Sequence, residues 1–123
     1  MELNKITEKV TVSPQITVAD IAAIKAAGFR AIICNRPDGE GVDQPNYDEI
    51  ESAAKSAGIE ARYVPVKTGI VTDEDVIAFD DALRDLQCPL LAYCRTGTRY
   101  ATLWSFHEAK KRPMSENLAA TKS

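Results

Sequence analysis

Late in the chain, the sequence reads Pro89-Leu90-Leu91-Ala92-Tyr93-Cys94-Arg95-Thr96-Gly97-Thr98-Arg99. Residues 89–93 form a short apolar run that is typical of a buried strand. Residues 99–111 are predicted to form a helix, which Arg112-Pro113 then breaks. The six residues from Cys94 to Arg99 therefore connect a buried strand to a helix. Strand–loop–helix units of this kind predict an α/β fold with a parallel sheet.

The residues before this stretch repeat the alternation of strand and helix. Strands are expected at residues 6–12, 29–34, 59–66 and 89–93, and helices at 18–27, 46–57, 72–87 and 99–111. Two helices begin with capping-box residues, Thr17 with Asp20 and Thr72 with Asp75. We expect one α/β domain over residues 1–113, with a mainly parallel sheet of four or five strands and helices on both faces. A polar tail, residues 114–123, follows it.

The composition narrows the classes of function. The chain has 123 residues, of which 45% are hydrophobic and 27% charged, and a net charge of -3. This balance offers no basic field for nucleic acid or an anionic membrane. The apolar runs are too short to span a bilayer, and no apolar signal core follows Met1, so we expect a cytoplasmic protein without a membrane partner. With three cysteines and one histidine, we expect no structural disulfide, no metal site and no cofactor.

The loop between Cys94 and Arg99 carries the chemistry. A helix that begins near Arg99 leaves its first amides without partners, and these amides and the helix dipole favour an anion. Gly97 allows the tight turn that points successive amides inward, so Thr96, Gly97 and Thr98 are predicted to bind an anion together with Arg95. The Arg99 guanidinium offers a planar fork for two anion oxygens. The same field favours the thiolate of Cys94, which predicts a nucleophile.

A purely structural turn is the alternative interpretation of this loop. A structural turn explains Gly97, but it does not explain Arg95 and Arg99. A positive charge at a helix start is unfavourable unless an anion binds there. We therefore expect an enzyme that acts on a small anionic substrate and uses Cys94 and Arg99 as its catalytic residues.

At this point the sequence resembles a known family, the phosphatase-like domain of beta-lactamase hydrolase-like proteins. The resemblance extends from about Ile6 to Glu108, and its shared segments are Val12-Ser13-Pro14-Gln15, residues 20–28, Asn35-Arg36-Pro37-Asp38-Gly39-Glu40, Tyr63-Val64-Pro65-Val66 and the loop 94–99. More distantly, the layout is similar to dual-specificity protein phosphatases. The resemblance implies their α/β fold, Cys94 as the nucleophile and Arg99 as the anion clamp. Relatives fused to a persulfide-oxidising metallo-hydrolase also imply such an enzyme as a possible partner.

Three departures separate this loop from that of the dual-specificity phosphatases. Those enzymes have five residues between the cysteine and the arginine, whereas four lie between Cys94 and Arg99, the length found in rhodanese-type sulfurtransferases. Tyr93 stands where they have histidine, and Tyr100 stands where they have serine or threonine. These differences keep sulfur transfer open beside phosphate chemistry.

Phosphatases also use an aspartate as general acid on a separate loop. Asp73 is one candidate, although an acidic residue at a helix start also complements the helix dipole. Asp38 and Glu40 are the other candidates. Arg36, on the same segment, is either a substrate contact or the partner of Asp38 or Glu40 in a salt bridge.

Three functions remain. A rhodanese-type sulfurtransferase, which forms a Cys94 persulfide from thiosulfate or a persulfide, is slightly favoured because its leaving group needs no general acid. A phosphatase-like hydrolase of phosphate esters, which forms a Cys94 phosphocysteine, is the alternative. A module that binds an anion or a partner without catalysis is the third.

Overall fold

The computed structural model of the chain describes residues 3–42, 44–67 and 71–95. The strands in this part are β1 (Asn4–Lys5), β2 (Val10–Ser13), β3 (Ala31–Cys34), β4 (Glu60–Tyr63) and β5 (Leu90–Tyr93). The helices are α1 (Ile21–Ala26), α2 (Tyr47–Ser56) and α3 (Asp73–Asp85), and the short 3-10 helix η1 (Val18–Asp20) leads into α1.

The five strands form one sheet in the order β1-β2-β5-β3-β4. Strand β5 is the middle strand and pairs in parallel with β2 on one side and β3 on the other. Strand β4 pairs in parallel with β3, and β1 adds an antiparallel edge to β2. The fold class predicted from the sequence is therefore confirmed, and the fifth strand is the short β1.

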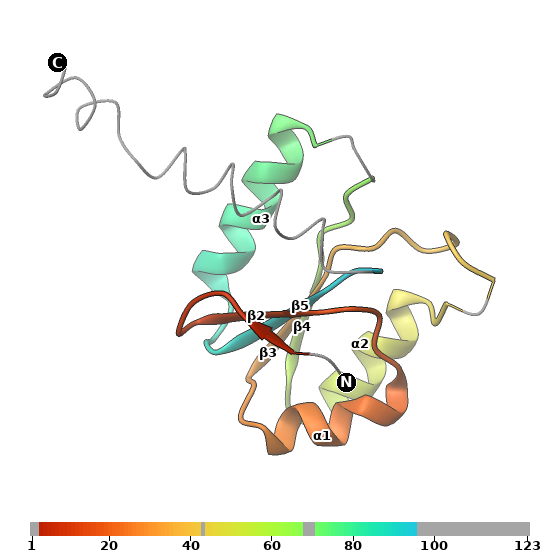
Figure 1. The fold of residues 1–123 in the computed structure, drawn as a ribbon, viewed down its shortest axis with the longest axis vertical. Coiled ribbons are helices and arrows are strands. Elements are labelled where there is room, and N and C mark those ends of the chain that lie inside the picture. The colour runs from red at the N-terminus through yellow and green to blue at the C-terminus, as the bar shows by residue number, and fades with distance from the viewer. Residues whose placement is uncertain (1–2, 43, 68–70, 96–123) are drawn as a thin grey trace, which may run out of the picture.

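Helices cover both faces of the sheet (Figure 1). The chain passes from β2 through α1 to β3, and from β3 through α2 to β4 at the edge of the sheet. It then passes through α3 back to β5, at the centre of the sheet. Because parallel crossovers are right-handed, this reversal puts α3 on the face opposite to α1 and α2. The position of β5 between its neighbours is thus set by the last crossover.

Each face of the sheet has its own apolar core. Successive side chains of a strand point to opposite faces. On the α1 and α2 face, the sheet contributes Ile32, Cys34, Leu91 and Tyr93, and the helices contribute Ile21, Ile24, Ile50 and Ala54. On the α3 face, Val10, Val12, Ala31, Ile33, Leu90 and Ala92 pack with Phe79, Ala82 and Leu86. Burial on both sides explains why β3 and β5 read as continuous apolar runs.

The helix starts agree with the sequence prediction. Both predicted capping boxes are present, at Thr17 with Asp20 and at Thr72 with Asp75. In the second, Thr72 Oγ1 accepts a hydrogen bond from Asp75 N at 3.1 Å, and Asp75 Oδ2 accepts one from Thr72 N at 3.0 Å. These bonds satisfy amides that a helix start otherwise leaves without partners, so the helix beginnings are encoded locally.

Some predicted element bounds are wrong. The strand expected at residues 6–12 is a turn followed by β2, because Thr7 Oγ1 accepts from Lys9 N and Val10 N, both at 3.1 Å. This turn brings Asn4–Lys5 back against β2 and so creates the fifth strand. The strand expected at 59–66 ends at Tyr63, and the helix expected to reach residue 87 ends at Asp85.

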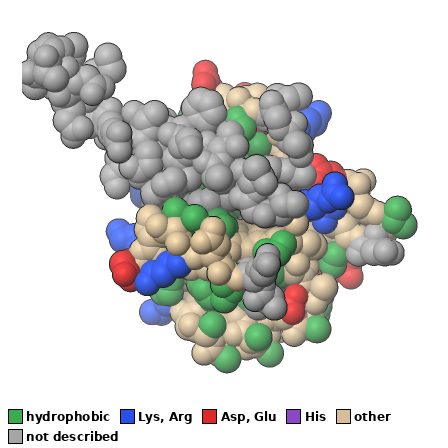
Figure 2. Space-filling view, viewed as in Figure 1, with side chains coloured by type: hydrophobic (Ala, Val, Ile, Leu, Met, Phe, Trp, Pro, Cys, Tyr) green, Lys and Arg blue, Asp and Glu red, His purple; other side chains and the backbone are tan. Residues whose placement is uncertain are grey.

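The helix predicted at residues 99–111, the tail 114–123 and most of the loop after Cys94 lie outside the described residues. Within the described part, no helix has the length and apolar character needed to cross a membrane. On the face seen in Figure 2, basic and acidic side chains are interspersed.

Candidate active site

Cys94 follows β5 directly and lies at the carboxyl edge of the sheet. Its N–H donates to the carbonyl oxygen of Ser13 at 3.3 Å, next to the end of β2. One residue earlier, the carbonyl oxygen of Tyr93 accepts from Asn35 N at 2.9 Å, next to the end of β3. Cys94 is 1% exposed, whereas Arg95 is exposed. The cysteine predicted as nucleophile therefore lies where the carboxyl ends of three parallel strands meet, the usual ligand position in such sheets.

Buried polar side chains gather at the same edge. Ser13 ends β2, and Asn35 and Arg36 follow β3; they are 1%, 0% and 7% exposed. The side-chain nitrogen of Asn35 donates to the carbonyl oxygen of Val64 at 3.0 Å, which ties β3 to the segment after β4. Its Oδ1 has no hydrogen-bond partner, which is uncommon for a buried oxygen. Asn35 was not predicted as a site residue, although its place as the first polar residue after an apolar strand was a usable signal.

Arg36 spans two loops at this edge. Its Nη1 donates to Gln15 Oε1 at 3.0 Å, and its Nε donates to Glu40 Oε1 at 3.3 Å. Of the two interpretations drawn from the sequence, the salt bridge with Glu40 is therefore present. A contact of Arg36 with substrate stays a prediction. The partner Gln15 was not foreseen, since 21 positions separate the two residues.

The two aspartates considered as general acids occupy different settings. The Oδ1 of Asp38 accepts from the N–H of Tyr47 at 2.8 Å, at the first residue of α2, and its own N–H donates to the hydroxyl of Tyr63 at 2.9 Å. Asp73 begins α3 and is exposed. Asp38 thus has a structural partner, while Asp73 is open to solvent, and a catalytic role for either stays a prediction.

Cys34 ends β3 on the opposite face from the α3 core, next to Tyr93 in the register. Its Sγ donates to the carbonyl oxygen of Arg36 at 3.2 Å. Burial raises the pKa of the Cys34 thiol, which opposes its use as a nucleophile. Burial also raises the pKa of the Tyr93 hydroxyl, which shares a hydrogen bond with Cys34. Cys34 is therefore a core residue at the end of an apolar strand.

The rest of the predicted anion loop, Thr96, Gly97, Thr98 and Arg99, lies outside the described residues. Within the part that is described, no three or more histidine, cysteine or acidic side chains are grouped as a metal site requires.

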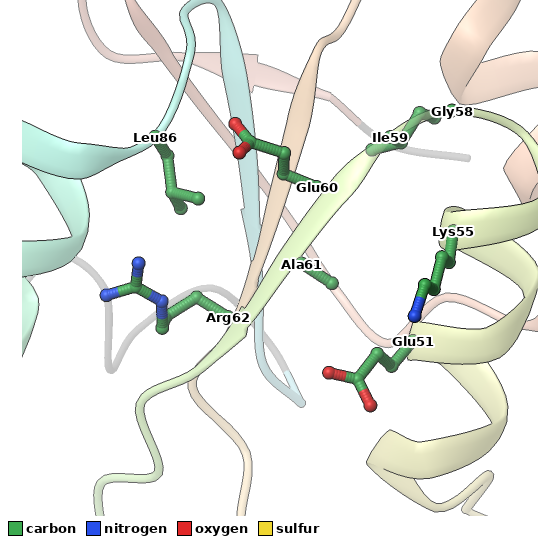
Figure 3. A pocket seen from close by; sticks show the side chains of 8 residues that line it. All are labelled: Glu51, Lys55, Gly58, Ile59, Glu60, Ala61, Arg62 and Leu86. Carbon is green, nitrogen blue, oxygen red and sulfur yellow. The ribbon is translucent and has the colours of Figure 1, made fainter.

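A groove of about 440 Å³ lies elsewhere, along β4 (Figure 3). Its walls come from α2, β4 and the residue after α3, and they include Glu51, Lys55, Arg62 and Leu86. Strand β4 is at the sheet edge, and β3 separates it from β5. This groove is therefore separate from the Cys94 site.

The described part of the chain has a phosphatase-like fold, a mainly parallel sheet that is covered by helices, and Cys94 follows its central strand directly. The chain belongs to the phosphatase-like domain family of beta-lactamase hydrolase-like proteins, whose model matches residues 2–111. The resemblance noted from the sequence is thus confirmed.

Relatives of known sequence agree with this membership. The beta-lactamase hydrolase-like protein of Agrobacterium fabrum is 37% identical over 109 residues, which cover 89% of this chain and 25% of that protein. The protein of the same name from Xylella fastidiosa (strain Temecula1) is 33% identical over 108 residues, or 88% of this chain and 25% of that protein. The chain therefore spans about a quarter of the length of the curated relatives it matches.

Solved structures support the fold. A candidate phosphatase from Neisseria meningitidis is 36% identical, with a TM-score of 0.83, and the match covers 99% of this chain and 87% of that one. The core catalytic domain of the PP-IP phosphatase Siw14 from Saccharomyces cerevisiae, solved with citrate, matches with a TM-score of 0.59 at 12% identity, over 77% of this chain and 56% of that one. The second match shows a shared fold alone.

Proposed function

We propose that this domain is a cysteine-dependent phosphatase that hydrolyses phosphate monoesters through a Cys94 phosphocysteine. The observation that carries the proposal is the position of Cys94 immediately after the central strand β5, beside the ends of β2 and β3. Membership of a phosphatase-like family and similarity to the Neisseria candidate phosphatase support it. Both similarities favour phosphate chemistry over the sulfur transfer that the loop length and the lack of a clear general acid had slightly favoured.

The reaction has two displacement steps. The Cys94 thiolate attacks phosphorus, so that an S–P bond forms while the P–O bond to the alcohol breaks, and the leaving oxygen takes a proton from a general acid or from water. Water then attacks the phosphocysteine, the S–P bond breaks, and inorganic phosphate leaves with the thiolate restored. Arg99 and the amides of the loop would hold the phosphoryl oxygens, and Arg95 would add positive potential.

The substrate class follows from the same features. A positive loop at the edge of a sheet suits a small dianion, and an ester with a good leaving group makes little demand on a general acid. We therefore expect aryl phosphates to be cleaved faster than alkyl phosphates. A cytoplasmic location and a persulfide-oxidising metallo-hydrolase partner stay predictions from the sequence and the resemblance.

The test is hydrolysis of p-nitrophenyl phosphate by the purified chain and by the variant Cys94→Ser. Phosphate release should be lost in Cys94→Ser, because a serine hydroxyl is not ionised at neutral pH. Cys88→Ser is the matched control: Cys88 is the exposed cysteine, and it lies before the amino end of β5, whereas Cys94 follows the carboxyl end. It should retain full activity.

Sulfur transfer is the second candidate, because four residues separate Cys94 from Arg99 as in rhodanese-type enzymes. The same preparations are incubated with thiosulfate and cyanide. Thiocyanate formation that depends on Cys94, without phosphate release, would replace the phosphatase proposal with sulfur transfer. If neither product forms while phosphate still binds, the anion-binding module is the remaining interpretation.

A further inference from the structure

We propose that the chain forms a symmetric dimer in which β4 pairs in antiparallel fashion with β4 of a second copy. Strand β4 is the last strand in the sheet order, and no other strand of the described residues pairs with its outer side. The groove of Figure 3 runs along this outer side, between α2 and the end of α3. An open edge with space beside it can accept one more strand.

The backbone of β4 presents its free groups at Ala61. Glu60 N donates to the carbonyl oxygen of Arg30 at 3.2 Å, and Val64 N donates to that of Cys34 at 2.9 Å, so these residues point their N–H groups toward β3. Backbone groups alternate along a strand, and the N–H and C=O of Ala61 therefore point outward. An antiparallel copy can exchange two hydrogen bonds with Ala61, one in each direction.

Charge then selects the register. If the twofold axis passes through Ala61, Glu60 lies opposite Arg62 of the second copy, and Arg62 lies opposite its Glu60. An axis through Arg62 would oppose two arginines, and an axis through Glu60 would oppose two glutamates, both of which are unfavourable. An axis between residues would pair outward groups with inward ones and lose the hydrogen bonds. Among these registers, only the one with its axis through Ala61 forms the backbone hydrogen bonds and also places opposite charges next to each other.

The side chains are arranged for this pairing. Figure 3 shows Glu60 and Arg62 on the same side of β4, with Ala61 on the other. Their present partners hold them weakly: Arg62 Nη2 lies 3.7 Å from Asp85 Oδ2, with both side chains more than a third exposed, and Glu60 accepts from Gln87 N at 3.3 Å. Each can therefore gain a partner across the edge.

A second complementary pair lies on α2. Glu51 and Lys55 line the groove on the side of Ala61. Because the twofold axis makes the two copies of α2 antiparallel, Glu51 of each copy faces the Lys55 end of the other. Opposite charges thus meet on both faces of the extended sheet, which favours a second copy of this chain over an unrelated partner.

Analytical ultracentrifugation of the full chain over a wide concentration range tests the proposal. Wild-type protein should show a monomer–dimer equilibrium that weakens with added salt. Glu60→Arg and Arg62→Glu each put like charges opposite one another twice in the dimer, and each should weaken association by about tenfold or more. The double variant Glu60→Arg/Arg62→Glu restores complementarity and should recover most of it.

Glu8→Arg is the matched control for Glu60→Arg, because both replace an acidic residue by arginine, and Glu8 is an exposed residue of the β1–β2 turn. It should leave association unchanged. The proposal is overturned if the wild-type chain is monomeric at the highest concentration. It is equally overturned if the single reversals act no more strongly than Glu8→Arg, or if the double variant is as weak as the single ones. Phosphatase activity is not involved in any of these readouts.

Discussion

Replacing Gly41 by alanine tests the arrangement of Arg36 at the carboxyl edge of the sheet. A Cβ atom at position 41 would lie 2.8 Å from Arg36 Nη2 and 3.7 Å from its Cζ. The first distance is too short for a non-bonded contact, so one of the two residues has to move. The end of an arginine usually moves easily, but here the guanidinium is buried and held by Gln15 at 3.0 Å and Glu40 at 3.3 Å. Relief of the contact therefore disrupts at least one of these bonds.

Two opposing effects decide whether Gly41→Ala raises or lowers the free energy of unfolding. A glycine-to-alanine change at an accessible backbone conformation stabilises by about 0.4–1 kcal/mol, because the unfolded chain loses freedom. Loss of a hydrogen bond from a charged, buried donor costs about 1.5–3 kcal/mol. The loss exceeds the gain, and we expect Gly41→Ala to lower the free energy of unfolding by about 1–2 kcal/mol. With an m value of about 2 kcal/mol/M, the urea midpoint falls by about 0.5–1 M.

A double-mutant cycle isolates the cause. Urea unfolding is followed by circular dichroism for wild type, Gly41→Ala, Arg36→Ala and the double variant. Without the guanidinium there is no contact to relieve, so Gly41→Ala in the Arg36→Ala background should be neutral or slightly stabilising. An equal loss of stability in both backgrounds would refute the reasoning, because the loss would then not depend on the Arg36 side chain.

Two further predictions concern protonation and catalysis. Burial raises the pKa of both the Cys34 thiol and the Tyr93 hydroxyl, so above about pH 8.5 the unfolded chain releases protons that the folded chain keeps, and the free energy of unfolding should fall as pH rises. Urea midpoints measured across this range should fall less steeply for Cys34→Val; identical slopes would contradict the burial argument. For the general acid, Asp38→Asn and Asp73→Asn are compared on alkyl and aryl phosphates. The variant that lacks the acid should lose about 100-fold or more on the alkyl ester and much less on the aryl ester, whereas undiminished alkyl hydrolysis in both would exclude both aspartates.

Local signals in the sequence were sufficient for most of the fold. Each capping box lies within four residues, and the apolar runs of β3 and β5 report burial on both faces, so the helices and the central strands were predictable. The β1–β2 hairpin was not, since Ile6, Val10 and Val12 alternate like a single strand, whereas the structure has a turn that is held by backbone hydrogen bonds and by the hydroxyl of Thr7. Strand order was also out of reach, because a strand's own side chains do not identify its neighbours.

The site was predictable in the same uneven way. Cys94 could be placed at the carboxyl end of its strand, because that end follows from chain direction alone. The surroundings required contacts between distant segments. Arg36 depends on Gln15, 21 residues earlier, and Asn35 depends on Val64, 29 residues later. Neither partner carries a sequence signal of its own, so the polar edge that surrounds Cys94 becomes visible only when β2, β3 and β5 are brought together.

The three cysteines show that position, rather than exposure, selects the proposed nucleophile. Cys88 is exposed but precedes β5 at the edge opposite to the anion loop, where no chemistry is predicted. Cys34 shares the carboxyl edge, but its thiol donates to the carbonyl oxygen of Arg36 and its raised pKa keeps it protonated. Cys94 combines the carboxyl edge with the central strand and the start of the arginine-bearing loop. Exposure alone would select Cys88, and activity measurements on separate cysteine variants are therefore the decisive comparison.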